Sequence, residues 1–435
     1  MKQWLILALY VIGLTACDRT KSNSAELPGV ALQEACNEAI TQVIVHDIFT
    51  PPVASRIYAY SNLAFYEAHR IDSENHRSLL PELKGFDSLP IPADRQAIDP
   101  RYAATKACLQ VAEALIFSMD SLRKSLSKIE LSFSDLSDSK RKASQVWADS
   151  VSALILRRAA TDNYRLTRGM PRYSSFGETG KWQQTPPEYA DATEPNWKRI
   201  IPLLMDSAGQ FKADPPPPYN VTPGSLYYQE LKEVIDVSKA ISPEQDTIAQ
   251  YWDDNPFVTK HKGHFAYSNK KITPVGHWIG MLGIFARQTN ASDHKAALAY
   301  AITSMAIFDG FIACWEQKYR TLTVRPITVI RANWESEWES LLQTPPFPEY
   351  TSGHSVISSA AATTASAIYG DTLSFHDTTE VRYLNLSRRF RSIRQAADEA
   401  GISRLYGGIH FRSALEQGKK QGNRVGELYL RFLSY

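Results

Sequence analysis

The sequence PEYTSGHSVISSAAATTASAIY, residues 348–369, contains the most informative helix start in this 435-residue chain. Ser352 and Gly353 stand directly before Val356 and a run of small residues, which is typical of an N-cap followed by a helix. A helix N-terminus presents free backbone N–H groups and the positive end of its dipole, and both favour a bound anion. The stretch therefore predicts a helix whose first turn is suited to an anion.

Charged and imidazole side chains that suit the same anion follow a regular order around this stretch. Lys318 and Arg325-Pro326 precede it, and Ser403-Arg404 and His410 follow it. Arginine matches pairs of anion oxygens, lysine adds a point charge, and an imidazole can bond to a central atom or move a proton. The set predicts a site for a tetrahedral oxyanion such as phosphate or vanadate.

These motifs and their spacings resemble those of the superfamily that joins type 2 phosphatidic acid phosphatases, other acid phosphatases and vanadium-dependent haloperoxidases. Six residues separate Lys318 from Arg325, and five separate Arg404 from His410. Residues 345–354 (PPFPEYTSGH) and Trp315 resemble the haloperoxidase branch, and looser similarity extends back to residues 182–187. The chain is thus similar to the bacterial vanadium-dependent haloperoxidases.

The resemblance implies a role for each matching residue. Vanadate would be held by the residues of the three motifs, and phosphate fits the same site: Lys318, Arg325, Ser352, Gly353, Arg404 and His410. His410 would coordinate vanadium, and His354 would be the acid–base group. Trp315 and Phe347 would line the cleft beside the peroxide, with core packing as the open alternative for both.

The motifs depart from the family pattern at two positions. Ala414 stands where the family has an aspartate that holds the axial histidine, so a backbone carbonyl or another carboxylate must orient the ring, or oxyanion binding is weakened. Thr351 replaces the usual proline. The sequence WDDNP at 252–256 is expected to supply a carboxylate that pairs with one of the arginines of the anion site.

Three functions follow from these motifs. The first is a vanadate-dependent haloperoxidase that oxidises halide with hydrogen peroxide to hypohalous acid, which then halogenates an organic acceptor. The second is a non-specific acid phosphatase that forms a phosphohistidine at His410. The third is an inactive oxyanion-binding lipoprotein, for which Ala414 is the support. A membrane-embedded lipid phosphatase is disfavoured, because we expect no apolar run of about twenty residues, the length needed to span a membrane, in residues 18–435.

Composition and patterning predict an all-α protein of the haloperoxidase and acid phosphatase type. The formal net charge of +2 argues against nucleic acid as a partner. Apolar residues recur at helical spacing in most of the chain, which favours two packed helical bundles. The expected divisions are a helical part at 31–225, ending in an irregular proline- and aromatic-rich layer at 161–225, and a phosphatase/haloperoxidase-type domain at 226–435.

Several local expectations accompany this division. Helices are expected near 31–47, 55–69, 101–118, 226–238, 275–288, 293–314, 355–369 and 378–400, after residues 137–139, and from His410 to about Leu433. Gly418, Gly422 and Gly426 share one face of that last helix, so another helix is expected to pass close to it. Trp182, Tyr189 and Trp197 are expected to be buried in the irregular layer.

The N-terminus predicts export. Residues 4–14 form a short apolar run after Lys2, and Leu14-Thr15-Ala16-Cys17 resembles the lipobox of bacterial lipoproteins. Residues 1–16 are therefore read as a signal peptide, Cys17 as the lipidated residue and 17–30 as a tether. A plain signal peptide cut near Ala16 is the alternative. The expected location is a membrane surface facing the periplasm or the cell exterior.

Cys36, Cys108 and Cys314 remain after such cleavage. In an oxidising compartment, Cys36 and Cys108 could pair and leave Cys314 as a buried thiol. No cysteine and histidine spacing predicts zinc, and histidines 261, 264 and 277 are expected to be structural or at the surface.

Overall fold

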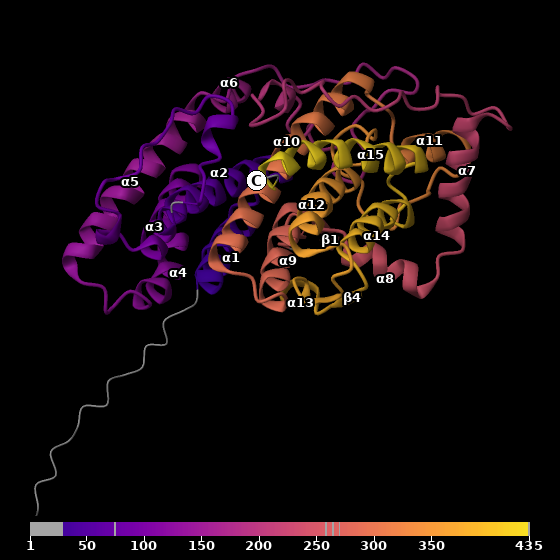
Figure 1. Ribbon diagram of the computed structural model, residues 1–435. Helices are drawn as coiled ribbons and strands as arrows, with labels where there is room; N and C mark the ends of the chain where they lie inside the picture. The colour runs from indigo at the N-terminus through magenta and orange to yellow at the C-terminus, as the bar shows by residue number, and fades with distance from the viewer. Residues whose placement is uncertain (1–28, 74, 257–258, 263–264, 269, 434–435) are drawn as a thin grey trace, which may run out of the picture.

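The computed structural model describes residues 29–433 except residues 74, 257–258, 263–264 and 269. Over this range the chain is built mainly of helices, and the predicted all-α class is confirmed (Figure 1). The predicted signal peptide, the lipidation site at Cys17 and most of the tether lie outside the described residues.

The N-terminal helices form one side of the molecule, in the indigo and purple part of Figure 1. Helix α2 packs against α3 and α5, and α1 packs against α3 and α4. Helices α2 and α3 begin with proline directly after the N-caps Thr50 and Asp99, whose side chains accept backbone N–H bonds. The elements are α1 (Gly29–Asp47), α2 (Pro51–His69), η1 (Arg70–Asp72), η2 (Leu80–Glu82), η3 (Arg95–Ala97), α3 (Pro100–Leu115), α4 (Met119–Leu131), α5 (Asp138–Ala160) and α6 (Tyr164–Arg168).

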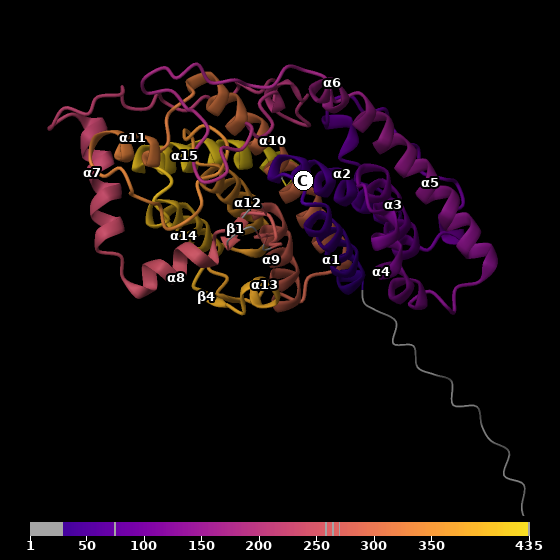
Figure 2. The same ribbon diagram turned by 180° about the vertical axis from the view of Figure 1, so that it is seen from behind.

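The C-terminal helices form the opposite side, and Figure 2 shows the same division from behind. Helix α12 lies at its centre and contacts α9, α10, α14 and α15. The helices that follow α6 in the chain are η4 (Trp197–Arg199), which contacts α6 and α10, and α7 (Leu226–Lys239), α8 (Pro243–Tyr251), α9 (Pro274–Gln288), α10 (Asp293–Thr321), α11 (Pro326–Asn333), α12 (Gly353–Tyr369), α13 (Val381–Leu384), α14 (Ile393–Tyr406), α15 (Arg412–Tyr429) and η5 (Leu430–Leu433).

Helix α10 joins the two sides, because it contacts both α2 and α12. One continuous hydrophobic core includes residues from α1 to η5, so burial of apolar surface couples the two groups of helices. Among the described residues, α10 is the one helix long and apolar enough to cross a membrane, and 94% of its most apolar window is buried inside the fold. The expectation that no such run exists was therefore wrong, and α10 is a core helix of the fold.

The glycines of α15 face α12, as predicted. A Cβ atom added at Gly422 would lie 2.1 Å from the carbonyl oxygen of Val356, and one at Gly426 would lie 2.9 Å from that of Ala360. No side chain fits between the two backbones at these points. The glycines therefore allow α15 to approach the helix that begins at the predicted anion site.

The segment between α6 and α7 is irregular and ordered, with η4 as its one helical turn among the described residues. Trp182 and Trp197 are buried as expected, whereas Tyr189 is 63% exposed and its predicted burial was wrong. Tyr189 directly follows the turn at residues 186–188 and has a positive φ of 47°. The carbonyl of Thr193 accepts hydrogen bonds from the Trp315 indole and the Tyr319 hydroxyl, so this layer supports the C-terminal half of α10.

The helix expected at 378–400 is interrupted. Strand β3 (Phe375–Asp377) pairs antiparallel with β4 (Arg388–Phe390), and Asn385 at φ 56° ends the short helix α13 between them. Ser392 then caps α14. A second antiparallel pair joins β1 (Thr259–Lys262) and β2 (Phe265–Ser268). Antiparallel pairing of β3 with β4, ten residues later, outweighs the local helical pattern here.

The three cysteines of the described chain are buried free thiols. Cys36 and Cys108 are neighbours, and a hydrogen bond between their side chains contributes to the raised pKa of Cys108. The two thiols are therefore close together, and the disulfide between them stays a prediction. Cys314 is buried and contacts the backbone carbonyl of Thr351, as expected for a small core residue.

Candidate active site

The ends of four helices bring the predicted anion-site residues together. Lys318 lies in the last turn of α10, Arg325 precedes α11, Ser352 caps α12, and Arg404 lies in the last turn of α14. His410 follows in the connection to α15. All five side chains are buried. Three buried cations near one another need an anionic partner, since burial of unpaired charge is costly.

Glu349 holds the ring of His410, which is the role that the family pattern gives to an aspartate at position 414. Its Oε1 lies 2.8 Å from Nδ1 of His410 and accepts the backbone N–H of Phe411 at 3.0 Å. This geometry places the proton on Nδ1 and leaves Nε2 with its lone pair. Ala414, in turn, is buried and uses its carbonyl to accept the N–H of Ser352. The question raised by Ala414 is answered by a carboxylate from the preceding motif.

Lys318 and Arg325 are held by backbone carbonyls. The ammonium of Lys318 donates to the carbonyls of residues 348 and 349 at 2.9 and 3.0 Å. Arg325 donates from Nε to the carbonyl of Phe347 and from Nη1 to that of Ile409, and the same Nη1 lies 3.1 Å from Nε2 of His410. Both cations also lie 5.0 Å from the centre of the Phe347 ring. Their positions are therefore set before any ligand arrives.

Arg404 completes the set of cations. Its Nη1 donates to the carbonyl of Trp252 at 2.5 Å, and its Nη2 lies 4.0 Å from a carboxylate oxygen of Asp253. The expected carboxylate from residues 252–256 is thus Asp253. Asp253 also pairs with Lys271 at 2.6 Å, which holds the carboxylate in place.

Buried polar atoms without a hydrogen bond point to what the site accepts. Among the described residues, Nη2 of Arg325, Nε of Arg404 and Nε2 of His354 are buried and have no hydrogen-bond partner. Burial, as the largest cause, lowers the pKa of Lys318 to about 7 and that of Arg325 to about 9. An oxyanion among these groups would satisfy the donors and restore the charged forms, so the residues fit vanadate or phosphate.

His354 stands at the open edge of the cluster, with its side chain 14% exposed. The ring hydrogen bonds with the backbone of Trp252, and Nε2 lies 4.0 Å from Asp254. Burial, followed by the charge of Arg404, holds the pKa of His354 well below its usual range. The ring is therefore neutral near pH 7 and has a nitrogen free to accept a proton.

Sequence reasoning missed a buried charge network behind His354. His277, at the start of α9, contacts Asp254 at 3.1 Å through Nδ1 and Asp377 at 2.9 Å through Nε2. Burial opposes the imidazolium, but the two carboxylates outweigh it and raise the pKa of His277 well above its usual range. Glu380 is buried beside Asp254, and burial raises its pKa to about 9. The Trp252 ring stacks on His277 at 4.5 Å, so this network fixes the segment that carries Asp253.

The carboxylates of this network come from segments more than a hundred residues apart, and His277 lies within an apolar helical stretch. His277 was therefore read as structural or as a surface residue, and only the first description is right. The one sequence signal for this network was the pair Asp253-Asp254, which was expected to contribute a carboxylate to the anion site. Histidines 261 and 264 lie in the segment whose side chains the structure does not describe.

A narrow cavity opens onto the imidazoles and one of the cations. Its walls include Trp315 and Phe347, whose ring centres are 5.0 Å apart, together with Phe311, Pro51, Pro274 and Pro345, and its polar end includes Gly353, His354, Arg404 and His410. Trp315 and Phe347 thus do both of the things expected of them: they pack in the core and face the cleft.

Comparison with solved structures identifies the family. A crystal structure of a bacterial vanadium-dependent iodoperoxidase matches this chain with a TM-score of 0.87 and 42% sequence identity, over 92% of this chain and 96% of that one. This chain is a vanadium-dependent haloperoxidase family member. The family model for the second helical-bundle domain of VCPO matches residues 298–435. The comparison with curated proteins gave no significant match.

Two further solved structures share the fold of the haloperoxidase. Holo- and apo-type structures of a bacterial vanadium-dependent chloroperoxidase match with TM-scores of 0.68 and 0.67, each at 18% identity and over 89% and 88% of this chain and 93% and 94% of those chains. The family model covers α10 from residue 298 onward and α11 to α15, which carry Trp315, Lys318, Arg325 and all later site residues. The family's anion-site motifs and the buried cations therefore lie in the same region of the fold.

Proposed function

We propose that this protein oxidises halide with hydrogen peroxide to hypohalous acid, using vanadate held at the buried cations. The observation that supports this most directly is the His410 ring. Glu349 occupies its Nδ1, and its Nε2 faces the guanidinium of Arg325 in a pocket of unpartnered donors. A nitrogen lone pair directed into a cationic pocket suits coordination to the central atom of an oxyanion.

The surrounding side chains would hold the oxyanion by charge and by hydrogen bonds. Lys318, Arg325 and Arg404 supply positive charge, and the first turn of α12 supplies the N–H of Gly353 and the dipole of the helix. Ser352 uses its oxygen to accept the N–H of Ser355, which leaves its hydroxyl proton available to the anion. Bound vanadate would supply a Lewis-acidic centre that activates peroxide without changing its own oxidation state.

His354 would act as the acid–base group. Its Nε2 has no hydrogen bond among the described residues, its ring is neutral near pH 7, and it lines the cavity by which peroxide would enter. The ring could therefore take a proton from the incoming peroxide and return it to the departing hydroxide, which leaves as water. The backbone of Trp252 and the buried Asp254 would hold the ring in place during this exchange.

We propose iodide as the preferred halide, and an organic molecule in solution as the acceptor of the hypohalous acid. The support for iodide is the 42% identity to a vanadium-dependent iodoperoxidase over nearly the whole chain. The cleft beside the anion site is lined by Trp315 and Phe347, whose polarisable rings suit a large, weakly hydrated anion near the cations.

Iodide and bromide oxidation by hydrogen peroxide tests this function, with and without added orthovanadate. We expect vanadate-dependent oxidation, faster with iodide, that is lost in His410→Ala and retained in the matched control His46→Ala, which removes an exposed histidine. Hydrolysis of p-nitrophenyl phosphate is measured in parallel. Phosphatase turnover without vanadate, inhibited when vanadate is added, together with no halide oxidation, would support the phosphohistidine alternative instead.

We also propose that the chain is exported and anchored through a lipid on Cys17, at a surface facing the periplasm or the cell exterior. The support is the apolar run at residues 4–14 followed by Leu-Thr-Ala-Cys. Expression with a radiolabelled fatty acid, followed by membrane fractionation, tests this proposal. Label and membrane attachment should both be lost in Cys17→Ser, and an unlabelled wild-type chain would contradict the anchor.

A further inference from the structure

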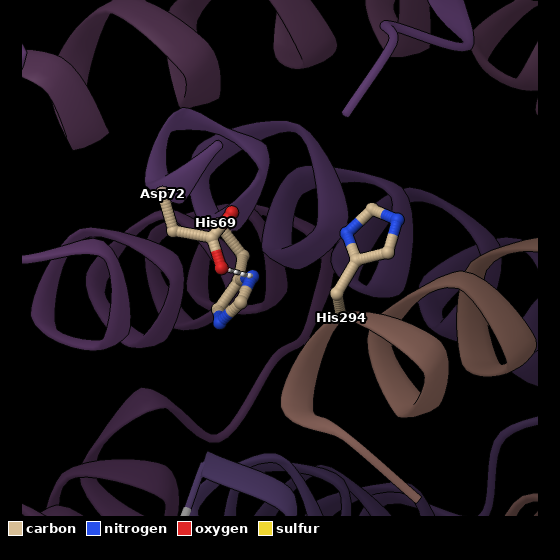
Figure 3. Close-up of side chains that lie close together, drawn as sticks. All are labelled: His69, Asp72 and His294. Carbon is tan, nitrogen blue, oxygen red and sulfur yellow. Dashed lines mark ion pairs between the residues drawn. The ribbon is translucent and has the colours of Figure 1, made fainter. Parts of the chain in front are cut away.

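Three side chains far from the anion site converge where α2 ends and α10 begins. His69 is the last residue of α2, Asp72 lies in η1, and His294 is the second residue of α10. Figure 3 shows His69 and Asp72 side by side, with the His294 ring facing them from α10. One ligand atom from each of the three lies within 4.8 Å of the other two. Two imidazoles and one carboxylate are a donor set for a transition metal such as zinc.

One ring nitrogen of each histidine, the Nδ1 atom, has no hydrogen-bond partner among the described residues. Nδ1 of His69 and Nδ1 of His294 are buried and make no hydrogen bond, although Nδ1 of His69 lies 3.8 Å from Asp72. Burial lowers the pKa of His69, and burial together with His76 lowers that of His294 to about 4. Both rings are thus neutral at physiological pH, which is the form that binds a metal. A buried nitrogen without a partner is costly, and a metal ion would remove that cost.

His76 holds the cluster from outside. Its Nδ1 lies 2.5 Å from the Oδ1 of Asp72, and its ring stacks on that of His294 with centres 3.3 Å apart and planes 4° apart. A histidine bonded to the second oxygen of a ligating carboxylate resembles the outer contacts that orient metal ligands. Asp72 would then present Oδ2 to the metal, and the hydrogen bond to His76 would limit the rotation of Asp72.

The local charges and the space also suit a cation. The C-terminal end of α2 carries the negative end of that helix dipole, and the Asp72 carboxylate adds a full negative charge. The N-terminal end of α10 and the charge of Arg101 oppose a cation, whereas Asp293, which pairs with Arg101 at 3.1 Å, favours one. Tetrahedral zinc with bonds of about 2.0–2.2 Å places its ligand atoms roughly 3.3 Å apart. The 3.8 Å between His69 and Asp72 is close to that value, so closure needs mainly a small rotation of the partly exposed His294.

We propose that His69, Asp72 and His294 bind one divalent transition-metal ion of the zinc type, with water completing the coordination. The ion would tie α2 to the start of α10, two helices that already pack together. Residue 318 of the anion site lies 24 positions after residue 294 along α10, which is about 36 Å at the rise of an α-helix. The metal would therefore stabilise the fold and take no part in the halide chemistry.

Zinc chloride titrated into the EDTA-stripped full chain, purified without a histidine tag, tests this site by isothermal titration calorimetry. We expect one equivalent to bind the wild type and the control His46→Ala, and this binding to be lost in His294→Ala. His76→Ala is expected to weaken binding roughly 10–100-fold, because it removes only an outer contact. At a zinc concentration 100-fold above the Kd, the Tm of the wild type should rise by about 3 °C, whereas the Tm of His294→Ala should not change.

Asp72→Asn provides a second variant, since it keeps the shape of a partly exposed side chain and removes its charge. Cobalt(II) visible bands give an independent signature of imidazole and carboxylate coordination, expected in the wild type and lost in Asp72→Asn. The proposal is overturned if the wild type binds no zinc, or if His294→Ala and Asp72→Asn both keep the wild-type stoichiometry and Kd. Unchanged vanadate-dependent turnover in both variants is expected, because neither residue touches the anion site.

Discussion

Replacing Glu349 with glutamine tests how this chain orients its axial histidine. The carboxylate is buried, with Oε1 on Nδ1 of His410 at 2.8 Å and on the N–H of Phe411 at 3.0 Å. Glutamine has nearly the same shape, and its amide oxygen can keep both contacts. What Glu349→Gln removes is the negative charge that increases the basicity of the His410 ring and offsets part of the surrounding positive charge.

The expected loss is that of an outer partner of a metal ligand, which weakens affinity roughly 10–100-fold, or about 1.4–2.7 kcal/mol. Isothermal titration calorimetry with orthovanadate measures this Kd directly. The matched control is Glu230→Gln, because Glu230 makes the same kind of contact with Ser413 nearby and does not touch His410. The control should stay within about twofold of the wild type.

The pH dependence separates the charge of Glu349 from its shape. Burial raises the pKa of Glu349 to about 7, so its negative charge, and the vanadate affinity that depends on it, should be lost as pH falls through about 7. Lys318 has a pKa of about 7 from burial and acts in the opposite direction, since its charge is lost as pH rises. His410 stays neutral throughout, because burial holds its pKa well below its usual range. The difference between wild type and Glu349→Gln therefore isolates the Glu349 step.

Two results would refute this reasoning. One is a vanadate Kd in Glu349→Gln within twofold of the wild type at pH 8, where Glu349 is ionised. The other is a clear gain of affinity in Ala414→Asp, which would show that the family position, and not Glu349, limits orientation of the ring. Ala414 is buried, so an added carboxylate there should instead destabilise the fold.

Three further predictions concern the acid–base group, the buried charge network and the helix contact. His354→Ala should lower kcat for iodide oxidation about 10²–10⁴-fold and leave the vanadate Kd within a few-fold, and equal losses in both would contradict the acid–base role. Asp377→Asn should cost about 3 kcal/mol in urea unfolding. The raised pKa of His277 and the lowered pKa of Asp377 place this cost between about pH 4 and the pKa of His277. The destabilisation by Asp377→Asn should shrink as pH rises through the pKa of His277. A destabilisation that is constant with pH would exclude the ion pair as its source. Gly422→Ala should cost about 3 kcal/mol, because its Cβ would lie 2.1 Å from a backbone oxygen, whereas the control Gly169→Ala, with no atom nearer than 3.9 Å, should be neutral.

The motifs alone were sufficient for the cations and the two imidazoles. The side chains of the three motifs converge as expected: Lys318, Arg325, Arg404, His354 and His410. Each lies at or near the end of a helix, so its position along the chain already indicates its place at the site. The Ser352 cap and the glycine stripe of α15 were predictable for the same reason, since each rule acts within one helix or between neighbouring turns.

The tertiary structure alone decided which distant group completes each of these contacts. Glu349 replaces the missing aspartate because the loop before α12 passes beside His410, 61 residues later in the chain. His277 meets Asp254 and Asp377, and His294 meets the neighbouring pair His69 and Asp72, only where α9 and α10 pack against their neighbours. Local patterns determine helices and motif order, whereas a hydrogen bond or an ion pair between segments depends on how whole helices pack, and no local pattern records that packing.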